Sequence, residues 1–246
     1  MRRLLLPAES IREDRVLLTG EEAHYLLRVL RLAPGDRFSA VVGGEERVAT
    51  ITAVDGNQVT ASLATEITEP ADPRVEVRLF PGLPKAAKLE LIIQKCTELG
   101  VSFIQPVICR RSIPRPRADD VAHKLSRWER IAKEAARQCG RSAPPRLAAP
   151  APFSAVVEAA GSGGTGLIFA LAETSDQRPA GPLLGADCRE PIDVLVGPEG
   201  GFASEEVAEA VAGGFRVAGL GRRVLRAETA AIAACATIMR EAGELG

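Results

Sequence analysis

The stretch LVGPEGGFASEE, residues 195–206, decides the fold expected for the C-terminal part of this chain. It opens as the apolar end of a buried strand and turns through Gly-Pro-Glu-Gly-Gly. It then enters a helix that Ser204 can cap, with Glu205 and Glu206 in the first turn. Ligands of α/β sheets bind where a strand ends in this way, and glycines let them approach the backbone closely. The alternative for this pentapeptide alone is a plain structural turn.

The same stretch also limits the kind of ligand. It does not match GxGxxG, and it lacks the lysine and the hydroxyl residue of a phosphate-binding loop. Neither a dinucleotide nor ATP is therefore the favoured ligand.

A second stretch, LGRRVLRAETAAIAA at 220–234, shows the same order of features. A strand end is followed by a glycine turn, arginines and a helix. Two such loops in one parallel sheet can face each other, because the carboxyl ends of parallel strands share one edge. We therefore expect both loops to contribute to a single ligand site. The glycine-rich segment 161–166 precedes a strand and is expected to be only a loop.

From residue 75 onward the chain alternates strand-like and helix-like segments, which is typical of a parallel α/β fold. Continuous apolar runs fit strands that are buried on both faces. The expected strands are 75–83, 103–109, 166–173, 191–197 and 216–221, and the expected helices are 85–100, 125–139, one that begins at Ser204, and 228–243.

The first 72 residues differ from this pattern and predict a small, β-rich barrel. A helix is expected over 21–31, where three leucines share one side. The proline-containing, acidic segment 65–74 is the expected linker, so we assign the two domains to 1–72 and 73–246. Strands are expected at 38–42, 47–54 and 58–64, with tight turns between them.

Composition limits the classes of protein to which the chain can belong. Its 246 residues suffice for one large or two modest hydrophobic cores. No apolar run approaches the roughly 20 residues of a membrane-spanning helix, and no signal peptide is recognised, so a cytoplasmic protein without membrane contact is expected. The five cysteines are scattered without a CxxC pair and the two histidines lie far apart, so we expect reduced thiols and no metal site.

Charge is distributed unevenly, although the net charge is only −1. Residues 110–146 contain eleven Lys and Arg against four Asp and Glu, a difference of +7. A local basic surface is what binding to a nucleic-acid backbone requires. The simpler alternative is a solvated helix face.

Six motifs together carry a resemblance to a known family. They are HYLLRVLRLAPGD at 24–36, KLELIIQKCTELGV at 88–101, RRS at 110–112, RWERIAKEAARQCGR at 127–141, GPEGGF at 197–202 and LGRRVLRAETAA at 220–231. In this order and spacing they resemble the SPOUT-class methyltransferases, specifically the bacterial 16S rRNA uracil-N3 methyltransferases, over nearly the whole chain. Cys96 and Ala227 stand where that family commonly has alanine and threonine.

The resemblance implies an α/β protein with a PUA-like N-terminal β-barrel, a C-terminal SPOUT domain with a deep trefoil knot, and a homodimer. The implied reaction transfers a methyl group from S-adenosylmethionine to N3 of a uracil in 16S rRNA, uracil 1498 by resemblance, in free rRNA or in the assembled small subunit. Carried over by motif, the residues expected to bind the cofactor are Leu171, Leu195, Gly197, Glu199, Gly200, Leu220, Gly221, Leu225, Arg226 and Ala227.

This chemistry needs a group that removes or destabilises the N3 proton of uracil. Glu199 is the candidate general base, because a group within hydrogen-bond reach contributes about 10²–10⁴ in rate. Arg226 or Arg111 could instead stabilise the developing uracil anion. The alternative for Glu199 is that it only hydrogen-bonds loop amides. Glu228 is expected to pair with an arginine or to cap the last helix.

A basic, proline-broken segment, RRSIPRPRADD at 110–120, suits a substrate clamp beside a ligand site, with a plain surface linker as the alternative. Ser112 is expected to orient this loop or the base. The residues expected to face RNA are Arg28 and Arg31 of the small domain and Arg110, Arg111, Arg115 and Arg117 of this segment. The rival functions are a ribose 2′-O-methyltransferase of tRNA or rRNA and a non-catalytic RNA-binding protein.

Overall fold

The computed structural model describes two units, each with its own hydrophobic core. Unit 1 comprises residues 1–72 together with 136–143, and unit 2 comprises 73–135 and 144–246. The residues described within them are 3–7, 10–12, 14–42, 45–68, 72–114, 118–160, 163–170, 182–185, 188 and 190–245.

Unit 1 is built on a mixed, six-stranded sheet in the order β1-β4-β5-β6-β3-β2, a half-barrel with β1 and β2 at its edges. The long hairpin of β5 and β6 turns at Gly56, whose φ of 57° suits the tight turn expected there. The first three strands of unit 1 are too short to show a periodic pattern in the sequence. β6 continues through residues 65–68, where the sequence predicts the linker. The strands are β1 (Arg3–Leu5), β2 (Ile11–Arg12), β3 (Arg15–Leu18), β4 (Arg37–Val42), β5 (Glu45–Asp55) and β6 (Gln58–Thr68).

The helix of unit 1 changes its winding halfway along. α1 (Gly20–His24) continues directly into a π-helical turn, η2 (Tyr25–Val29). Leu26 is fully buried in the core of the unit, whereas Arg28 is exposed. The chain then turns sharply at Arg31, whose φ of 56° is left-handed. A regular helix over 21–31 is therefore not formed, and π turns of this kind occur frequently at functional sites.

The segment 136–143 comes from much later in the chain and completes unit 1. Its first residue is fully buried with apolar residues of β1 and β4. The Arg137 guanidinium lies 4.7 Å from the centroid of the Tyr25 ring, within cation–π range. The Ser142 N–H donates to the carboxylate of Asp72 at 3.0 Å. The core of the small unit therefore includes residues far beyond the N-terminal 72.

Unit 2 contains a six-stranded sheet in the order β10-β8-β7-β13-β12-β14, and every neighbouring pair is parallel. Its strands are β7 (Val77–Pro81), β8 (Phe103–Ile104), β10 (Arg146–Leu147), β12 (Thr165–Phe169), β13 (Ile192–Val196) and β14 (Arg216–Ala218). Its helices are α2 (Ala86–Glu98), α3 (Ala118–Cys139, which ends in unit 1), α4 (Phe153–Ala160), α5 (Ser204–Ala212) and α6 (Ala227–Glu241).

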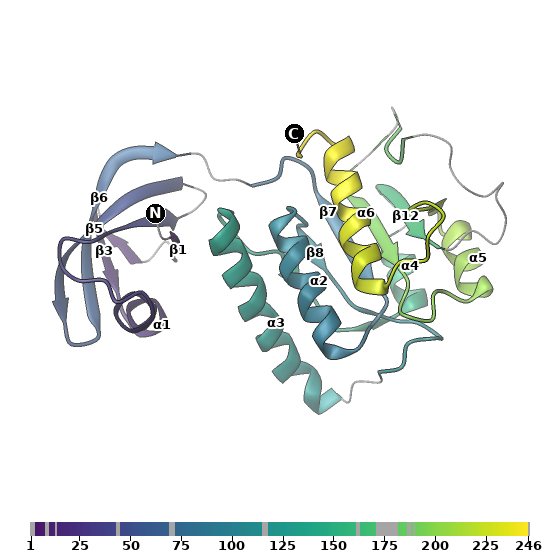
Figure 1. Cartoon of the computed structure of the whole chain (residues 1–246), viewed down its shortest axis with the longest axis horizontal. Helices are drawn as coiled ribbons and strands as arrows, with labels where there is room; N and C mark the ends of the chain where they lie inside the picture. Colours follow the sequence, from purple (N-terminus) through teal and green to yellow (C-terminus); the bar gives the residue numbers. More distant parts are fainter. Residues whose placement is uncertain are drawn as a thin grey trace. The chain divides into compact units, whose positions relative to one another are not determined.

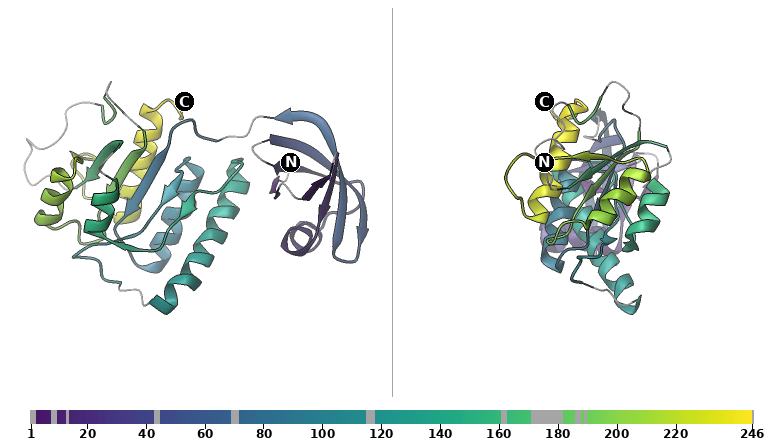
Figure 2. Two further views of the ribbon diagram at one scale, coloured as in Figure 1. Left: turned by 180° about the vertical axis from the view of Figure 1, so that it is seen from behind. Right: turned by 90° about the vertical axis from the view of Figure 1, so that its right-hand side faces the viewer.

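Helices cover both faces of this sheet. α2 and α6 lie side by side on one face, with α3 next to α2 (Figure 1), and share a core with it. α4 and α5 cover the other face, as the view of the molecule from behind in Figure 2 shows. Ala231 and Ala234 are fully buried, and their small size lets α6 pack closely. Strand residues alternate between the faces, with Leu79, Leu167 and Val194 on the first and Phe80, Ile168 and Leu195 on the second.

Two elements differ from their expected form. The apolar run 103–109 is not one strand, because β9 (Val107–Ile108) leaves the main sheet and pairs with β11 (Ala151–Pro152). Pro106 separates β8 from β9 and has no N–H with which to continue a ladder. α3 begins at Ala118, so the end of the proline-broken segment is helical.

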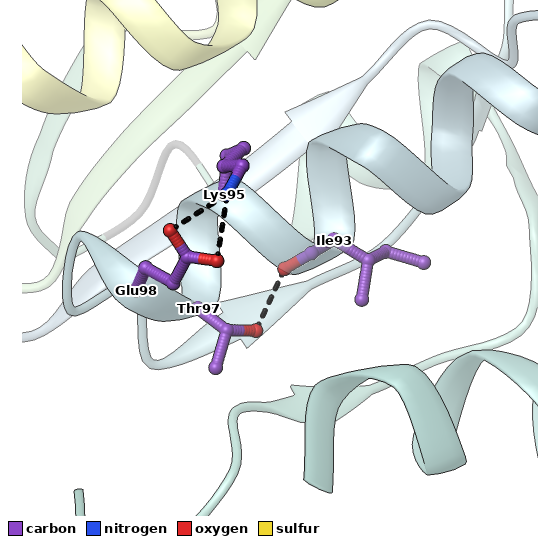
Figure 3. Close-up of polar contacts among 4 residues, drawn as sticks. All are labelled: Ile93, Lys95, Thr97 and Glu98. Carbon is purple, nitrogen blue, oxygen red and sulfur yellow. Dashed lines mark hydrogen bonds and ion pairs between the residues drawn. The ribbon is translucent and has the colours of Figure 1, made fainter. Parts of the chain in front are cut away.

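The last turn of α2 is stabilised by contacts within the helix itself. Lys95 Nζ donates to both carboxylate oxygens of Glu98, at 2.9 and 3.0 Å (Figure 3). Thr97 Oγ1 donates to the carbonyl oxygen of Ile93 at 2.7 Å. The helix ends as predicted before Gly100, whose φ of 99° is left-handed.

Candidate functional site

The two glycine-containing loops emerge at the same edge of the parallel sheet. The first loop, residues 197–203, follows β13, and the second loop, residues 219–226, follows β14. Because all strands of this sheet are parallel, both loops leave at its carboxyl edge. The turn 82–85 after β7 leaves at this edge as well, and β7 neighbours β13. The first turns of α2 and α6 therefore start beside the two loops.

Close backbone packing shapes the first loop. The Gly82 N–H donates to the Val196 carbonyl at 2.7 Å, and a Cβ on Gly82 would lie only 2.5 Å from the Pro198 nitrogen. A Cβ on Gly197 would lie 3.1 Å from the Gly201 Cα. The Gly201 N–H donates to the Pro198 carbonyl at 2.8 Å, at a φ of 68°. These glycines are needed to form the loop, whatever ligand it binds.

The turn 109–112 supports the first loop from outside. The Arg111 Nη1 donates to the carbonyl oxygen of Gly200 at 3.1 Å, and a Cβ on Gly200 would lie 3.0 Å from the Arg111 Cβ. The Ser112 hydroxyl accepts a hydrogen bond from the Cys109 N–H at 3.1 Å, so Ser112 orients the turn, as one of its two expected roles requires. Arg111 therefore lies directly beside the glycine loop.

A buried glutamate ties this turn to α5. Glu206 is 4% exposed; its Oε1 accepts the Arg110 N–H and its Oε2 accepts the Ala203 N–H, both at 2.8 Å. Ala203 is the N-cap residue of α5, so Glu206, and not the expected Ser204, satisfies this helix end. The Arg110 side chain pairs with exposed Glu205 at 3.1 Å.

The second loop is far less supported. A Cβ on Gly219 or Gly221 would meet no other atom within 4 Å, and Gly221 has a φ of 91°. Val224 is 76% exposed. Arg226 is the N-cap residue of α6 and is exposed, and within the described part of the chain its guanidinium has no hydrogen-bond or ion-pair partner. Its charge is therefore available to a ligand.

One lysine connects the two loops. Lys88, in the first turn of α2, places its Nζ 3.2 Å from the Glu199 Oε1 of the first loop. The same nitrogen lies 3.3 Å from the Oε2 of Glu228, which follows the second loop in the first turn of α6. The Lys85 N–H also donates to the Glu199 Oε1 at 3.3 Å. Glu228, expected to pair with an arginine or to cap the last helix, lies in the first turn of α6, and its ion-pair partner is Lys88 and not an arginine.

These contacts decide the ionisation of Glu199. Burial alone would raise the pKa of Glu199, but its own N–H, the Lys88 ammonium and the Lys85 N–H outweigh burial and lower that pKa. The hydrogen bond to Glu199 raises the pKa of Lys88 against the effect of burial, and Glu228 adds to the increase. Glu199 is therefore a carboxylate at neutral pH and a weaker base than an ordinary glutamate.

The backbone of both loops fits the cofactor that the resemblance implies. Gly201, Gly219 and Gly221 each face open space where a side chain would otherwise project. A ligand can therefore reach the N–H and C=O groups of both loops. This arrangement suits a molecule held largely through backbone groups, as the resemblance implies for S-adenosylmethionine.

The remaining expected cofactor residues lie in different environments. Leu195 is fully buried in the core under α4 and α5, so its side chain fills the core, the alternative reading of a leucine at this position. Leu220 is partly buried against the opposite core, Leu225 is partly buried and Ala227 is buried. Leu171, expected to bind the cofactor, and Arg115 and Arg117, expected to face RNA, lie outside the described residues.

Sequence reasoning missed Lys85 and Lys88. The signal is the segment KAAK at 85–88, which puts two lysines at the N-terminus of a helix. The helix dipole disfavours cations there, so such a placement indicates nearby carboxylates. In unit 1, Arg28 and Arg31 are both exposed, as an RNA-facing role requires.

Two further features bear on function in the part of the chain that the structure describes. No helix there has both the length and the apolar character needed to cross a membrane. No cluster of three or more His, Cys, Asp or Glu side chains there is arranged to hold a metal ion.

Comparison with known proteins identifies the family. Residues 71–239 match the RNA methyltransferase domain family, and residues 18–64 match the RNA methyltransferase PUA domain family. Ribosomal RNA small subunit methyltransferase E of Synechocystis is 38% identical over 241 residues, covering 96% of this chain and 76% of the relative.

Solved structures agree with the sequence matches. A methyltransferase of Legionella pneumophila in complex with S-adenosylmethionine has a TM-score of 0.83 and 30% identity, covering 96% of this chain and 95% of that one. Ribosomal RNA small subunit methyltransferase E of Neisseria gonorrhoeae, bound to S-adenosylmethionine, has a TM-score of 0.80 and 28% identity, covering 98% of both chains. The expected combination of a PUA-like domain and a SPOUT-type α/β domain is confirmed. The chain thus belongs to the RNA methyltransferase family that includes ribosomal RNA small subunit methyltransferase E.

Proposed function

We propose that this protein transfers the methyl group of S-adenosylmethionine to N3 of a uracil in 16S rRNA, with uracil 1498 as the expected target. The observation that carries the proposal is the pair of loops at one sheet edge, in a chain whose structural relatives were solved with S-adenosylmethionine. Both loops expose backbone glycines, which is what a ligand held by N–H and C=O groups requires.

For the cofactor, we propose a site formed by the backbone of the two loops. The first loop contributes Gly197, Glu199 and Gly200, and the second contributes Leu220, Gly221, Leu225, Arg226 and Ala227. Leu171 stays an expected contact on the adenosine side. S-adenosylmethionine, when bound, supplies an activated methyl group on a sulfonium that is itself a good leaving group.

In the reaction, Arg226 is assigned the role of stabilising the uracil anion. Uracil N3 carries a proton at neutral pH. A guanidinium beside a carbonyl oxygen favours the deprotonated form, so that the N3 proton passes to water, and it stabilises the negative charge that remains on the base. Arg226 is exposed at the N-cap of α6, and its guanidinium has no partner among the described residues. Arg111 is assigned a supporting role, because it already donates to the Gly200 carbonyl.

Glu199 is assigned to holding the site together and not to proton removal. An efficient general base has a pKa near the working pH, and the contacts of Glu199 lower its pKa away from that range. Its carboxylate is engaged by the Lys85 N–H and the Lys88 ammonium. This matches the alternative in which Glu199 hydrogen-bonds loop amides.

For the substrate, we propose that RNA contacts Arg28 and Arg31 of unit 1 and Arg110, Arg111, Arg115 and Arg117 of unit 2. Arg28, Arg31, Arg110 and Arg111 are exposed, which suits phosphate contacts that fix the position of the RNA without reading its sequence. A homodimer, the trefoil knot and a cytoplasmic location follow from the resemblance and belong to the same proposal.

The test is to incubate the purified protein and labelled S-adenosylmethionine with small ribosomal subunits and with free 16S rRNA that lack the modification. Digestion and mass spectrometry then locate the label. We expect one methyl group on the uracil base, and tRNA serves as the control substrate. A label on a ribose 2′-oxygen would support the rival transferase, and cofactor binding without any transfer would contradict the proposed reaction.

A further inference from the structure

Lys88 occupies a position that is unfavourable for a lysine on its own helix. It lies in the first turn of α2, where the helix dipole and the free N–H groups repel a cation. Its Nζ is nevertheless held between two carboxylates, 3.2 Å from Glu199 and 3.3 Å from Glu228. The contacts with Glu199 and then Glu228 raise the pKa of Lys88 against the opposing effect of burial.

The two carboxylates lie at different loops of the same site. Glu199 is part of the first loop, and Glu228 follows the second loop by two residues. The Glu228 Oε2 is buried and accepts no hydrogen bond from any described residue, so the ammonium of Lys88 is the charge that compensates it. Without this ammonium, the buried Glu228 oxygen at the start of α6 would have no ion-pair partner among the described residues and would face the negative charge of Glu199.

We propose that Lys88 is a positioning residue that joins the first and second loops into one cofactor site through Glu199 and Glu228. The inference rests on the proposed function only for the identity of the ligand. Lys88 holds the spacing of the loops, and methyl transfer itself is left to other groups.

The same helix offers a matched control. Lys95 also forms an ion pair, but its partner Glu98 lies on α2 itself, at 2.9 and 3.0 Å (Figure 3). Lys95→Met removes the same charge from the same helix as Lys88→Met does, without separating any two loops. Both variants are first checked for unchanged folding by thermal unfolding.

The first experiment is calorimetric titration of the full chain with S-adenosylmethionine. We expect Lys88→Met to weaken binding about 10-fold, equivalent to about 1.4 kcal/mol, and Lys95→Met to change it by less than about twofold. In turnover assays the KM for the cofactor rises with the Kd, whereas kcat at saturating cofactor falls by less than about threefold. A fall in kcat at unchanged cofactor affinity would overturn the positioning role.

A second experiment distinguishes charge compensation from simple packing. In the variant that combines Lys88→Met with Glu199→Gln and Glu228→Gln, no uncompensated carboxylate remains. We expect its cofactor affinity to recover to within about threefold of the native value, because the loss of affinity in Lys88→Met comes from the two carboxylates left without a counter-charge. Affinity as weak as in Lys88→Met alone would contradict this explanation.

Hydrogen exchange of the ligand-free protein separates this inference from the proposed function. Lys88→Met is expected to accelerate amide exchange in both loops, and Lys95→Met in neither. If the native protein bound no S-adenosylmethionine, the proposed function would fail while this measurement still tested the role of Lys88. Equal exchange in native protein and Lys88→Met would overturn the inference even if methyl transfer were demonstrated.

Discussion

The two loops of the site differ in how they are held. The first loop is fixed on several sides, by Gly82 beneath it, by Arg111 on the Gly200 carbonyl, and by Glu206 at the start of α5. The second loop exposes Gly219 and Gly221 to open space. One half of the site is thus built by tight packing, while the other leaves its backbone and an arginine free. Substitutions in the first loop should therefore alter stability and binding together, and substitutions of exposed residues in the second loop should alter cofactor binding or chemistry with little effect on stability.

The strongest test of this contrast is Gly82→Ala. The new Cβ would lie 2.5 Å from the Pro198 nitrogen, which is backbone and cannot rotate away. We expect a loss of about 3 kcal/mol in the free energy of unfolding, from overpacking, together with a loss of cofactor affinity of about 100-fold. Denaturant unfolding and calorimetry measure both. Gly219→Ala is the control for stability and should change it by less than about 1 kcal/mol, since open space surrounds that site.

Arg226→Ala tests the opposite half of the contrast. Loss of a charge that stabilises a developing anion should reduce single-turnover methyl transfer by about 10²-fold. The thermal midpoint should stay unchanged, because the exposed Arg226 guanidinium forms no hydrogen bond or ion pair with a described residue. Native turnover in this variant would remove Arg226 from the chemistry, and a lower thermal midpoint would show that the second loop is structurally supported after all.

Glu206→Ala asks whether the first loop depends on a single buried carboxylate. The change leaves the N–H groups of Arg110 and Ala203 without their acceptor, and should lower the free energy of unfolding by about 2 kcal/mol. Glu205→Ala removes a neighbouring, exposed carboxylate and should cost less than about 0.5 kcal/mol. If both variants unfolded at the same denaturant concentration, the anchoring role of Glu206 would be refuted.

The smallest effect is expected for Glu199→Gln, which keeps an acceptor for the Lys85 N–H. If Glu199 were the general base, the substitution would lower the single-turnover rate by about 10²-fold. If Glu199 is a loop contact, as proposed, the rate should fall by less than about fivefold. Because its pKa is lowered in the folded protein, its ionised form stabilises that state above the unfolded value of about 4.3. This contribution disappears as the pH falls through the lowered folded value, so the native and variant stability curves should converge as the pH falls below the unfolded value.

Periodicity predicted the elements of this fold that are long enough to show a period. The strands at β4, β5, β7, β12 and β13 and the helices α2 and α6 were all indicated by their apolar patterns. Strands of two or three residues, such as β8 and β9, have no period, and their separation at Pro106 depends on which sheet each one joins. The π-helical turn η2 likewise depends on packing, since its sequence reads as an ordinary amphipathic helix.

The loops of the candidate site were readable from the sequence, but their partners were not. Glycine turns before helix starts are local patterns, so both loops could be located. The pairing of Lys88 with Glu199 and Glu228 joins three distant segments, and no local spacing encodes it. The side chain of Leu195 points into the core because strand residues alternate between the two faces, which a motif match does not register.

The segment 136–143 has a consequence for how the chain folds during synthesis. The ribosome makes residues 1–72 first, but the unit they form is completed by a buried alanine at 136 and by Ser142, which donates to Asp72. The N-terminal unit therefore stays incomplete until most of α3 has emerged. Its last contacts are long-range in sequence and late in time, so its assembly is coupled to the growth of the methyltransferase half. A chain shortened to its first 72 residues would leave that surface uncovered, and one that begins after residue 72 would leave the segment without its partner.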